Sequence, residues 1–204
     1  MKVLIVAKTH MQNAACVGGI LANNRSVRLL QPNGHNHPTD TDYQIGQIWE
    51  IEFQERQDTT PPHVEDILVQ QRRKIGTHPA LRKYLTETVS PWKGKTDNLY
   101  DNLIRFSQSG RGYISHRIGL PKVSTGYWLP DKSLICVTIE GKPYYKYESN
   151  LGNDQFIHYV GFENPIEIIH PNTLVRVSLA RWWRPDDMPT MEKRCYLQLS
   201  GWYL

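Results

Sequence analysis

The pattern of apolar and polar positions predicts short strands over the first third of the chain. Residues 1–9 form an apolar run rich in β-branched residues and bounded by lysines, which indicates a buried strand. Residues 15–32 predict a hairpin, because Asn23 and Asn24 tolerate the positive φ that a tight reversal needs. Residues 47–54 alternate apolar and polar side chains, as a strand with one buried face does.

Two adjacent glycines, Gly18 and Gly19, interrupt the first arm of the predicted hairpin. Such glycines weaken an ordinary strand, and they often mark a bulge, a sharp bend or a close approach of two backbones. The second arm places Val27 and Leu29 on one face and Arg28 on the other. We therefore expect a small and strongly curved sheet.

The period changes to helical between residues 77 and 108. Apolar residues then recur three or four positions apart, at Leu81, Tyr84, Leu85 and Val89. A second helix is predicted from Thr96 or Asp97, because both residue types are natural N-caps. Its predicted buried positions are Leu99, Tyr100, Leu103 and Ile104. We expect these two helices to pack between or across two strand-rich halves.

The second half of the chain is almost wholly β in character. Five strands are predicted, over residues 133–140, 143–149, 156–162, 172–183 and 194–204. Their spacing is typical of a sandwich or a small barrel. The predicted fold class is therefore mainly β with a helical insertion. The predicted domains are a first barrel over residues 1–76, a helical pair and glycine-rich connector over 77–125, and a second barrel over 126–204.

Composition and charge narrow the setting of the protein. The 204 residues carry a net charge of +4, which permits a polyanionic partner. Cys16, Cys136 and Cys195 are odd in number and far apart, so neither a disulfide framework nor a CxxC metal site is indicated. The N-terminal apolar run is shorter than a signal-peptide core, and no later stretch reaches the length of a membrane span. We expect a cytoplasmic protein that does not contact a membrane.

The last two strands supply the main candidate surface. Strand alternation places Arg176 and Trp182 on one face, and Tyr196 and Trp202 on the corresponding face of the next strand. Nucleic-acid-binding barrels combine arginine with aromatic planes in this way. The alternative is that the aromatic residues lie under the helices or between the halves. The predicted nucleic-acid-binding residues are Arg28, Arg72, Arg73, Lys74, Arg176, Trp182, Arg184, Tyr196 and Trp202.

The sequence contains few signals of an enzyme. It has no GxSxG, HExxH or P-loop motif. His63, Glu65 and Asp66 would suit acid–base work, but Glu65 and Asp66 are adjacent and would point to opposite sides of a strand. Cys195 follows two basic residues, yet a buried strand cysteine is the favoured interpretation. We expect no catalytic residues.

Two histidines two positions apart raise the question of a metal. His35 and His37 lie in a polar loop, and no third ligand is indicated nearby. The basic run of residues 72–74 is open to two interpretations, a phosphate contact or a solvated loop. We expect no bound metal and no cofactor.

Several stretches together resemble the dual OB-containing domain family of prokaryotic proteins. They are AKTHM at residues 7–11, CVGGI at 16–20, RSVRLL at 25–30, HVEDILV at 63–69, VSLARWW at 177–183 and CYLQLSGWYL at 195–204. The resemblance implies two OB-like barrels in tandem, a nucleic-acid role by analogy of fold, and a genome-defence or mobile-element setting. It carries over no site residues.

The function predicted from the sequence is a non-enzymatic module that binds single-stranded or structured DNA or RNA. It would bind through the outer face of one barrel. A protein–protein interaction subunit that docks through an aromatic face is the alternative. A hydrolase that uses His63, Glu65 and Asp66 is a more remote one.

Overall fold

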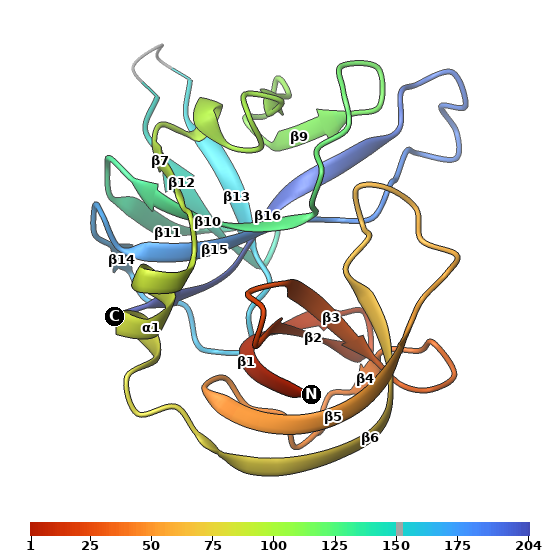
Figure 1. Cartoon of the computed structure of the whole chain (residues 1–204). Coiled ribbons are helices and arrows are strands. Elements are labelled where there is room, and N and C mark those ends of the chain that lie inside the picture. Colours follow the sequence, from red (N-terminus) through yellow and green to blue (C-terminus); the bar gives the residue numbers. More distant parts are fainter. Residues whose placement is uncertain (150–152) are drawn as a thin grey trace. The chain divides into compact units, whose positions relative to one another are not determined.

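The computed structural model describes residues 1–149 and 153–204 of the chain. The chain divides into two compact units, Met1–Val89 and Ser90–Leu204, here called the first and the second unit. Strands dominate both (Figure 1), and the described residues form one α-helix, α1 (Leu81–Thr88). The mainly β fold class is therefore confirmed. No helix in the described residues has the length and apolar character needed to cross a membrane.

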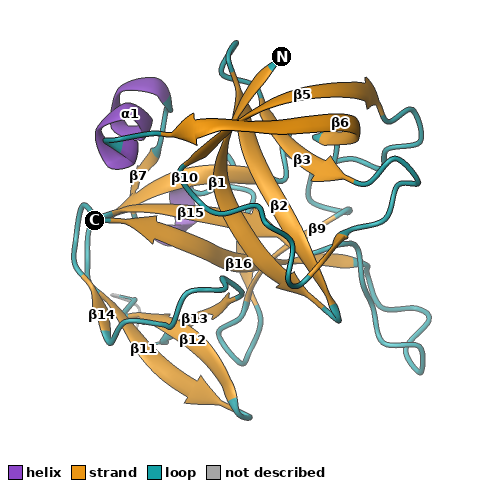
Figure 2. Ribbon diagram, turned by 90° about the horizontal axis from the view of Figure 1, so that it is seen from below, coloured by secondary structure: helices purple, strands orange, loops and turns teal. Residues whose placement is uncertain are grey.

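The first unit is a closed five-stranded barrel. Its strands are β1 (Lys2–Met11), β2 (Ala14–Leu21), β3 (Ser26–Leu30), β5 (Gln47–Glu55) and β6 (Asp66–Thr77), and a short strand β4 (His37–Pro38) pairs with β2. The order is β1-β5-β6-β3-β2, and pairing of β1 with β2 closes the ring (Figure 2). The β3–β6 pair is parallel, whereas the other ladders of the unit are antiparallel.

The paired glycines lie opposite a bulge in the first barrel. In the β1–β2 ladder Ile5 is opposite Gly19 and Ala7 is opposite Gly18, so a bulge in β1 faces the glycine pair. A Cβ atom on Gly19 would lie 2.5 Å from the Cγ2 atom of Val3, which is closer than any real contact. The expectation of a strongly curved sheet at this hairpin is confirmed.

The second unit is built on one large sheet. Its strands are β7 (Trp92–Gly94), β8 (Arg105–Phe106), β9 (Gly112–Ser115), β10 (Thr125–Pro130), β11 (Leu134–Ile139), β12 (Lys142–Tyr147), β13 (Gln155–Tyr159), β14 (Ile168–Ile169), β15 (Leu174–Leu179) and β16 (Arg194–Tyr203). Their order is β14-β11-β12-β13-β16-β15-β10-β7, and β9 pairs with β8 and β16. The β13–β16 pair is parallel, as β3–β6 is in the first unit.

A short connection curls this sheet into a second barrel. Strands β10 and β11 lie near opposite ends of the strand order, yet only residues 131–133 separate them along the chain. The two sides of the sheet are therefore brought close together at this connection. One core cluster accordingly contains side chains from β10, β11, β12, β13, β15 and β16, including Trp128, Leu134, Tyr145, Ile157, Val177 and Leu199.

The predicted pair of helices is half right. The first helix is present as α1, and Leu85 is its fully buried residue. The second is only a 3-10 turn at Thr96–Asn98. It stops there because Tyr100, Asp101 and Asn102 adopt the positive φ of the left-handed region, which a right-handed helix cannot contain. Predicted core residues of this segment, Leu99, Tyr100 and Ile104, are nevertheless buried.

Candidate nucleic-acid interface

A groove lies on the outer face of the second barrel. The strand residues directly next in sequence to those that line this groove, such as Tyr145, Ile157 and Leu199, point the other way and are fully buried in the core. The groove encloses about 290 Å³. We call it the aromatic groove, and it is lined by Arg111, Gly112, Tyr144, Phe156, His158, Ala180, Trp183, Tyr196, Leu197 and Gln198.

The floor of the aromatic groove is a row of side chains across three strands. Tyr144 of β12 is the register partner of His158 of β13, which is in turn the partner of Gln198 of β16. The rings of Tyr144 and His158 stack with centroids 4.9 Å apart and an interplanar angle of 29°. The guanidinium carbon of Arg111 lies 5.5 Å from the centroid of the Tyr144 ring. A stacked pair of aromatic rings and a cation are thus next to each other, and the Tyr144 ring within this stack is buried.

Trp183 forms an exposed wall of the aromatic groove. Its side chain is 53% exposed, and its ring centroid lies 6.1 Å from that of Tyr196. Backbone hydrogen bonds of 2.9 Å in both directions join Trp183 to Arg194 at the start of β16. An indole that is held by its backbone and open to solvent can stack a base without further rearrangement.

The loop that carries Trp183 is fixed at both ends. Glu192 accepts hydrogen bonds from the Ser115 hydroxyl and from Arg194, whose Nε and Nη2 atoms lie 3.0 and 2.9 Å from its Oε1 atom. The Ser115 and Arg194 contacts also hold the pKa of Glu192 below its usual value. Arg184 donates from Nη1 to the carbonyl of Pro189 at 2.6 Å, which closes the loop on itself.

Positive charge surrounds the floor. Burial, then the charges of Lys142 and Arg111, hold the pKa of His158 below its usual value, so the imidazole is neutral at pH 7. Arg111 forms an ion pair of 3.5 Å with Glu140, whose side chain is 79% exposed. Solvent screens such a pair, so Arg111 keeps its ability to bind a second anion. The second unit holds 14 lysine and arginine residues against 11 acidic ones, and the first holds 10 against 9.

Of the nine residues predicted to bind nucleic acid, Tyr196 lines the aromatic groove. Arg184 anchors the neighbouring loop. Arg176 is only 6% exposed, so the expectation that it faces solvent is wrong. It sits on β15 between β10 and β16, opposite the buried Tyr127. Its charge also acts on Tyr203, whose pKa burial raises well above the usual value.

The two predicted tryptophans do not form an outward surface. Trp202 packs against the core, with its ring centroid 5.2 Å from that of Tyr159. The cause is a bulge: Arg176 pairs with Gly201 but Val177 pairs with Leu199, so the intervening residue of β16 is unmatched and the alternation reverses. Trp182 also packs against the core cluster, although it is partly exposed.

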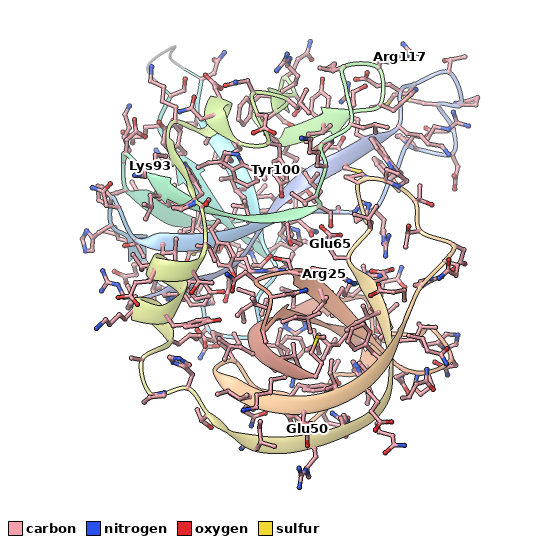
Figure 3. The ribbon with its side chains drawn as sticks, in the orientation of Figure 1. Arg25, Glu50, Glu65, Lys93, Tyr100 and Arg117 are labelled. Carbon is pink, nitrogen blue, oxygen red and sulfur yellow. The ribbon has the colours of Figure 1, made fainter. Side chains whose placement is uncertain are left out.

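The three arginines predicted in the first unit are held by carboxylates. Arg28 donates two hydrogen bonds of 2.6 Å to Asp66. Arg72 lies 2.7 Å from Asp42, and Arg73 donates to Glu50 at 2.6 Å. Figure 3 shows Glu50 on the outside of β5. Lys74, the remaining predicted residue of this unit, is exposed on β6. None of these four residues is among the described residues that line the aromatic groove.

The three residues considered for a hydrolase, His63, Glu65 and Asp66, are buried, and Asp66 takes part in ion pairs. The Asp66 carboxylate is held by Arg28 and lies 3.8 Å from Arg56. His63 and Glu65 are both 6% exposed. Within residues 1–149 and 153–204, no three His, Cys, Asp or Glu residues form a group that could hold a metal ion.

Sequence reasoning missed most of the groove. Arg111 lies in the glycine-rich stretch, which has no clear periodicity to place it. Tyr144 and His158 lie in strands that were predicted, but the side chains were not assigned to a surface. Trp183 follows Trp182 directly, and the strand pattern gave no reason to prefer it. The signal that could have found Tyr144 and His158 is the alternation with the buried Tyr145 and Ile157.

Two curled sheets in one chain, each with a parallel ladder on its last strand (β6 paired with β3, and β16 paired with β13), define a tandem OB-fold protein. OB folds generally bind nucleic acids or proteins. The family model for the dual OB-containing domain matches residues 1–202, and the chain belongs to this family. Searches of curated proteins and of solved structures returned no match.

Proposed function

We propose that the protein binds single-stranded nucleic acid in the aromatic groove. The observation that carries the proposal is the exposed Trp183 ring beside a floor in which Tyr144, His158 and Arg111 are stacked. Base–aromatic stacking contributes about 1–3 kcal/mol per base, and a cation beside the stack meets the phosphate. The position also supports the proposal, because OB folds bind oligonucleotides across their second and third strands. These correspond to β12 and β13 when β10 and β11, which only three residues separate, are counted together as the first strand.

A single strand fits this chemistry better than a duplex does. The faces of duplex bases are covered by their neighbours, so aromatic planes can reach them only when the bases are unstacked. No aspartate or glutamate is among the described residues that line the groove. An acidic side chain there would repel the phosphates.

The proposal is tested by fluorescence anisotropy with labelled 12-mer DNA and RNA, single-stranded and duplex, at two salt concentrations. Trp183→Ala should weaken single-strand binding by about 1–3 kcal/mol with little change in salt dependence, because it removes stacking. Arg111→Gln should reduce the slope of log K against log salt by roughly one, because it removes one positive charge beside the bound strand. Met188→Ala, also exposed and on the same loop but outside the groove, is the matched control.

Wild-type protein that binds none of the four probes would overturn the proposal. So would Trp183→Ala protein that binds as tightly as the control variant. The interpretation of Trp183 would then change from a stacking surface to a surface for another ligand.

A protein partner is the second candidate function, and a separate observation favours it. Ile118, Leu120 and Val123 are exposed on the loop after β9, where Figure 3 labels Arg117. Exposed apolar side chains next to an arginine are typical of protein interfaces. Binding at such a surface would depend little on salt, whereas phosphate contacts weaken steeply as salt increases.

A further inference from the structure

We propose that the aromatic groove selects keto bases, which are guanine, thymine and uracil, over the amino bases adenine and cytosine. The inference rests on the proposed function and adds the class of base that the site prefers. The stacking surfaces cannot make this choice, because every base has a π-face. The choice must come from the polar groups beside them.

The polar side chains of the groove are biased toward donors. Arg111 carries five N–H donors and no acceptor, and Trp183 carries one N–H donor and no acceptor. No side chain among the described lining residues is an acceptor only, because none is Asp or Glu. The remaining polar groups, on Tyr144, His158, Tyr196 and Gln198, can donate or accept. A donor-rich lining matches base edges that present carbonyl oxygens.

Arg111 is the residue best suited to read such an edge. It lies over the Tyr144 ring, so a base stacked nearby would bring its polar edge toward the guanidinium. Arginine binds the O6 and N7 acceptors of guanine in a bidentate way, and thymine and uracil offer the O4 acceptor. The exocyclic amino groups of adenine and cytosine would instead point a donor at a cation.

The floor contributes in the same direction. Lys142 and Arg111 both act on His158, so the potential over the floor is positive and favours carbonyl oxygens over amino groups. Gln198 is adjacent to His158 across the β13–β16 ladder and can turn its amide to donate. Glu140 is the nearest carboxylate to Arg111 at 3.5 Å, but it does not line the groove.

The test compares two 12-mer DNA strands by fluorescence anisotropy, d(GT)6 and d(AC)6. Both alternate purine with pyrimidine and carry the same charge, so stacking and phosphate contacts are matched while one strand has only keto bases and the other only amino bases. We expect d(GT)6 to bind about five- to tenfold more tightly, since one well-placed polar contact discriminates by roughly this factor. The dT12 and dC12 strands repeat the comparison without purines.

Variants assign the preference to the groove. Arg111→Lys keeps the charge but loses the planar fork, and it should bring the ratio of the two affinities close to one. Gln198→Glu introduces an acceptor in nearly the same shape, and it should shift the ratio toward d(AC)6. Gln70→Glu makes the same charge change on the exposed face of β6 in the first unit, and it should leave the ratio unchanged.

Each result decides between the two proposals. Equal binding of both strands, or tighter binding of d(AC)6, overturns the keto preference and leaves the proposed function intact. Failure of both strands to bind overturns the proposed function and the preference with it. A wild-type preference that Arg111→Lys and Gln198→Glu both leave unchanged also overturns this inference, because the discrimination then arises elsewhere.

Discussion

At the scale of single residues, the aromatic groove depends on where a few side chains are allowed to point. Backbone contacts place each of the three main groove residues. A β-bridge joins Arg111 to β13, and another joins Trp183 to β16. His158 is held within the ladders that β13 forms with β12 and β16. None of these contacts involves neighbours in sequence. For that reason the residue types could be read from the chain, but their convergence could not.

His158 predicts how binding responds to pH. Its pKa is held below the usual value in the free protein, and phosphates in the groove would raise it, so the complex takes up a proton. Affinity for a single strand should therefore increase as pH falls below about 6.5 and level off once both forms are protonated. Anisotropy titrations between about pH 7.5 and about pH 5 measure this change in affinity.

Two variants separate this effect from general acid behaviour. His158→Gln should remove most of the pH dependence, since glutamine does not titrate in this range. His116→Gln, an exposed histidine outside the groove lining, is the control and should retain it. Identical pH profiles for all three proteins would show that His158 takes no part in binding.

At the scale of elements, alternation predicted the strands well and their faces only in part. The period of two found β5, β15 and β16, and a continuous apolar run found β1. The strand predicted over residues 172–183 extends four residues beyond the end of β15. The alternation failed where a bulge reverses the parity, as between Tyr196 and Trp202 in β16. A bulge depends on the partner strand, so one strand's own sequence does not reveal it. The prediction of the second helix failed because Tyr100, Asp101 and Asn102 adopt the left-handed conformation, which the apolar period of the sequence does not reveal.

Gly19 predicts the stability of the β1–β2 hairpin. Gly19→Ala should lower the free energy of unfolding by about 1–3 kcal/mol, because the added Cβ would lie 2.5 Å from a Val3 methyl and 3.2 Å from the Leu4 carbonyl oxygen. Gly76→Ala is the control, since no heavy atom lies within 4 Å of the position of its Cβ. Urea denaturation followed by circular dichroism measures both. Equal midpoints would contradict the close packing at Gly19.

At the scale of the whole molecule, the two units share strand order but not surface chemistry. In the first unit the arginines of the predicted interface are matched with carboxylates, whereas in the second the groove combines a weakly paired arginine with aromatic rings. Fold class could be predicted because it follows from periodicity summed over many residues. Which of the two units carries the candidate binding surface could not be predicted, because this depends on a few ion pairs between residues that are distant in sequence.

The molecule should lose stability in mild acid through His37. Burial, and then the charge of Arg72, lower the pKa of His37 to about 4. The unfolded chain binds this proton near pH 6.5, so folding stability is complete above that pH and falls as the pH approaches 4. The loss amounts to about 2–3 kcal/mol for this group. Denaturation of the first unit, followed by hydrogen exchange at pH 7 and at about pH 4.5, measures it.

His37→Gln should reduce this acid sensitivity, because the glutamine carries no proton to gain. His35→Gln, an exposed histidine in the same loop, provides the comparison and should behave as the wild type does. If all three proteins lose the same stability between the two pH values, carboxylates rather than His37 dominate the response.

The contacts that anchor the Trp183 loop have a kinetic consequence. Ser115, Glu192 and Arg194 hold this loop in the free protein, so the single strand that we propose as ligand would not have to wait for a slow closure. Encounter is then governed by diffusion and by the excess positive charge of the second unit. Because the loop is already ordered, the protein loses little conformational entropy on binding. Substitutions in the groove should therefore change the dissociation rate of a bound strand far more than its association rate.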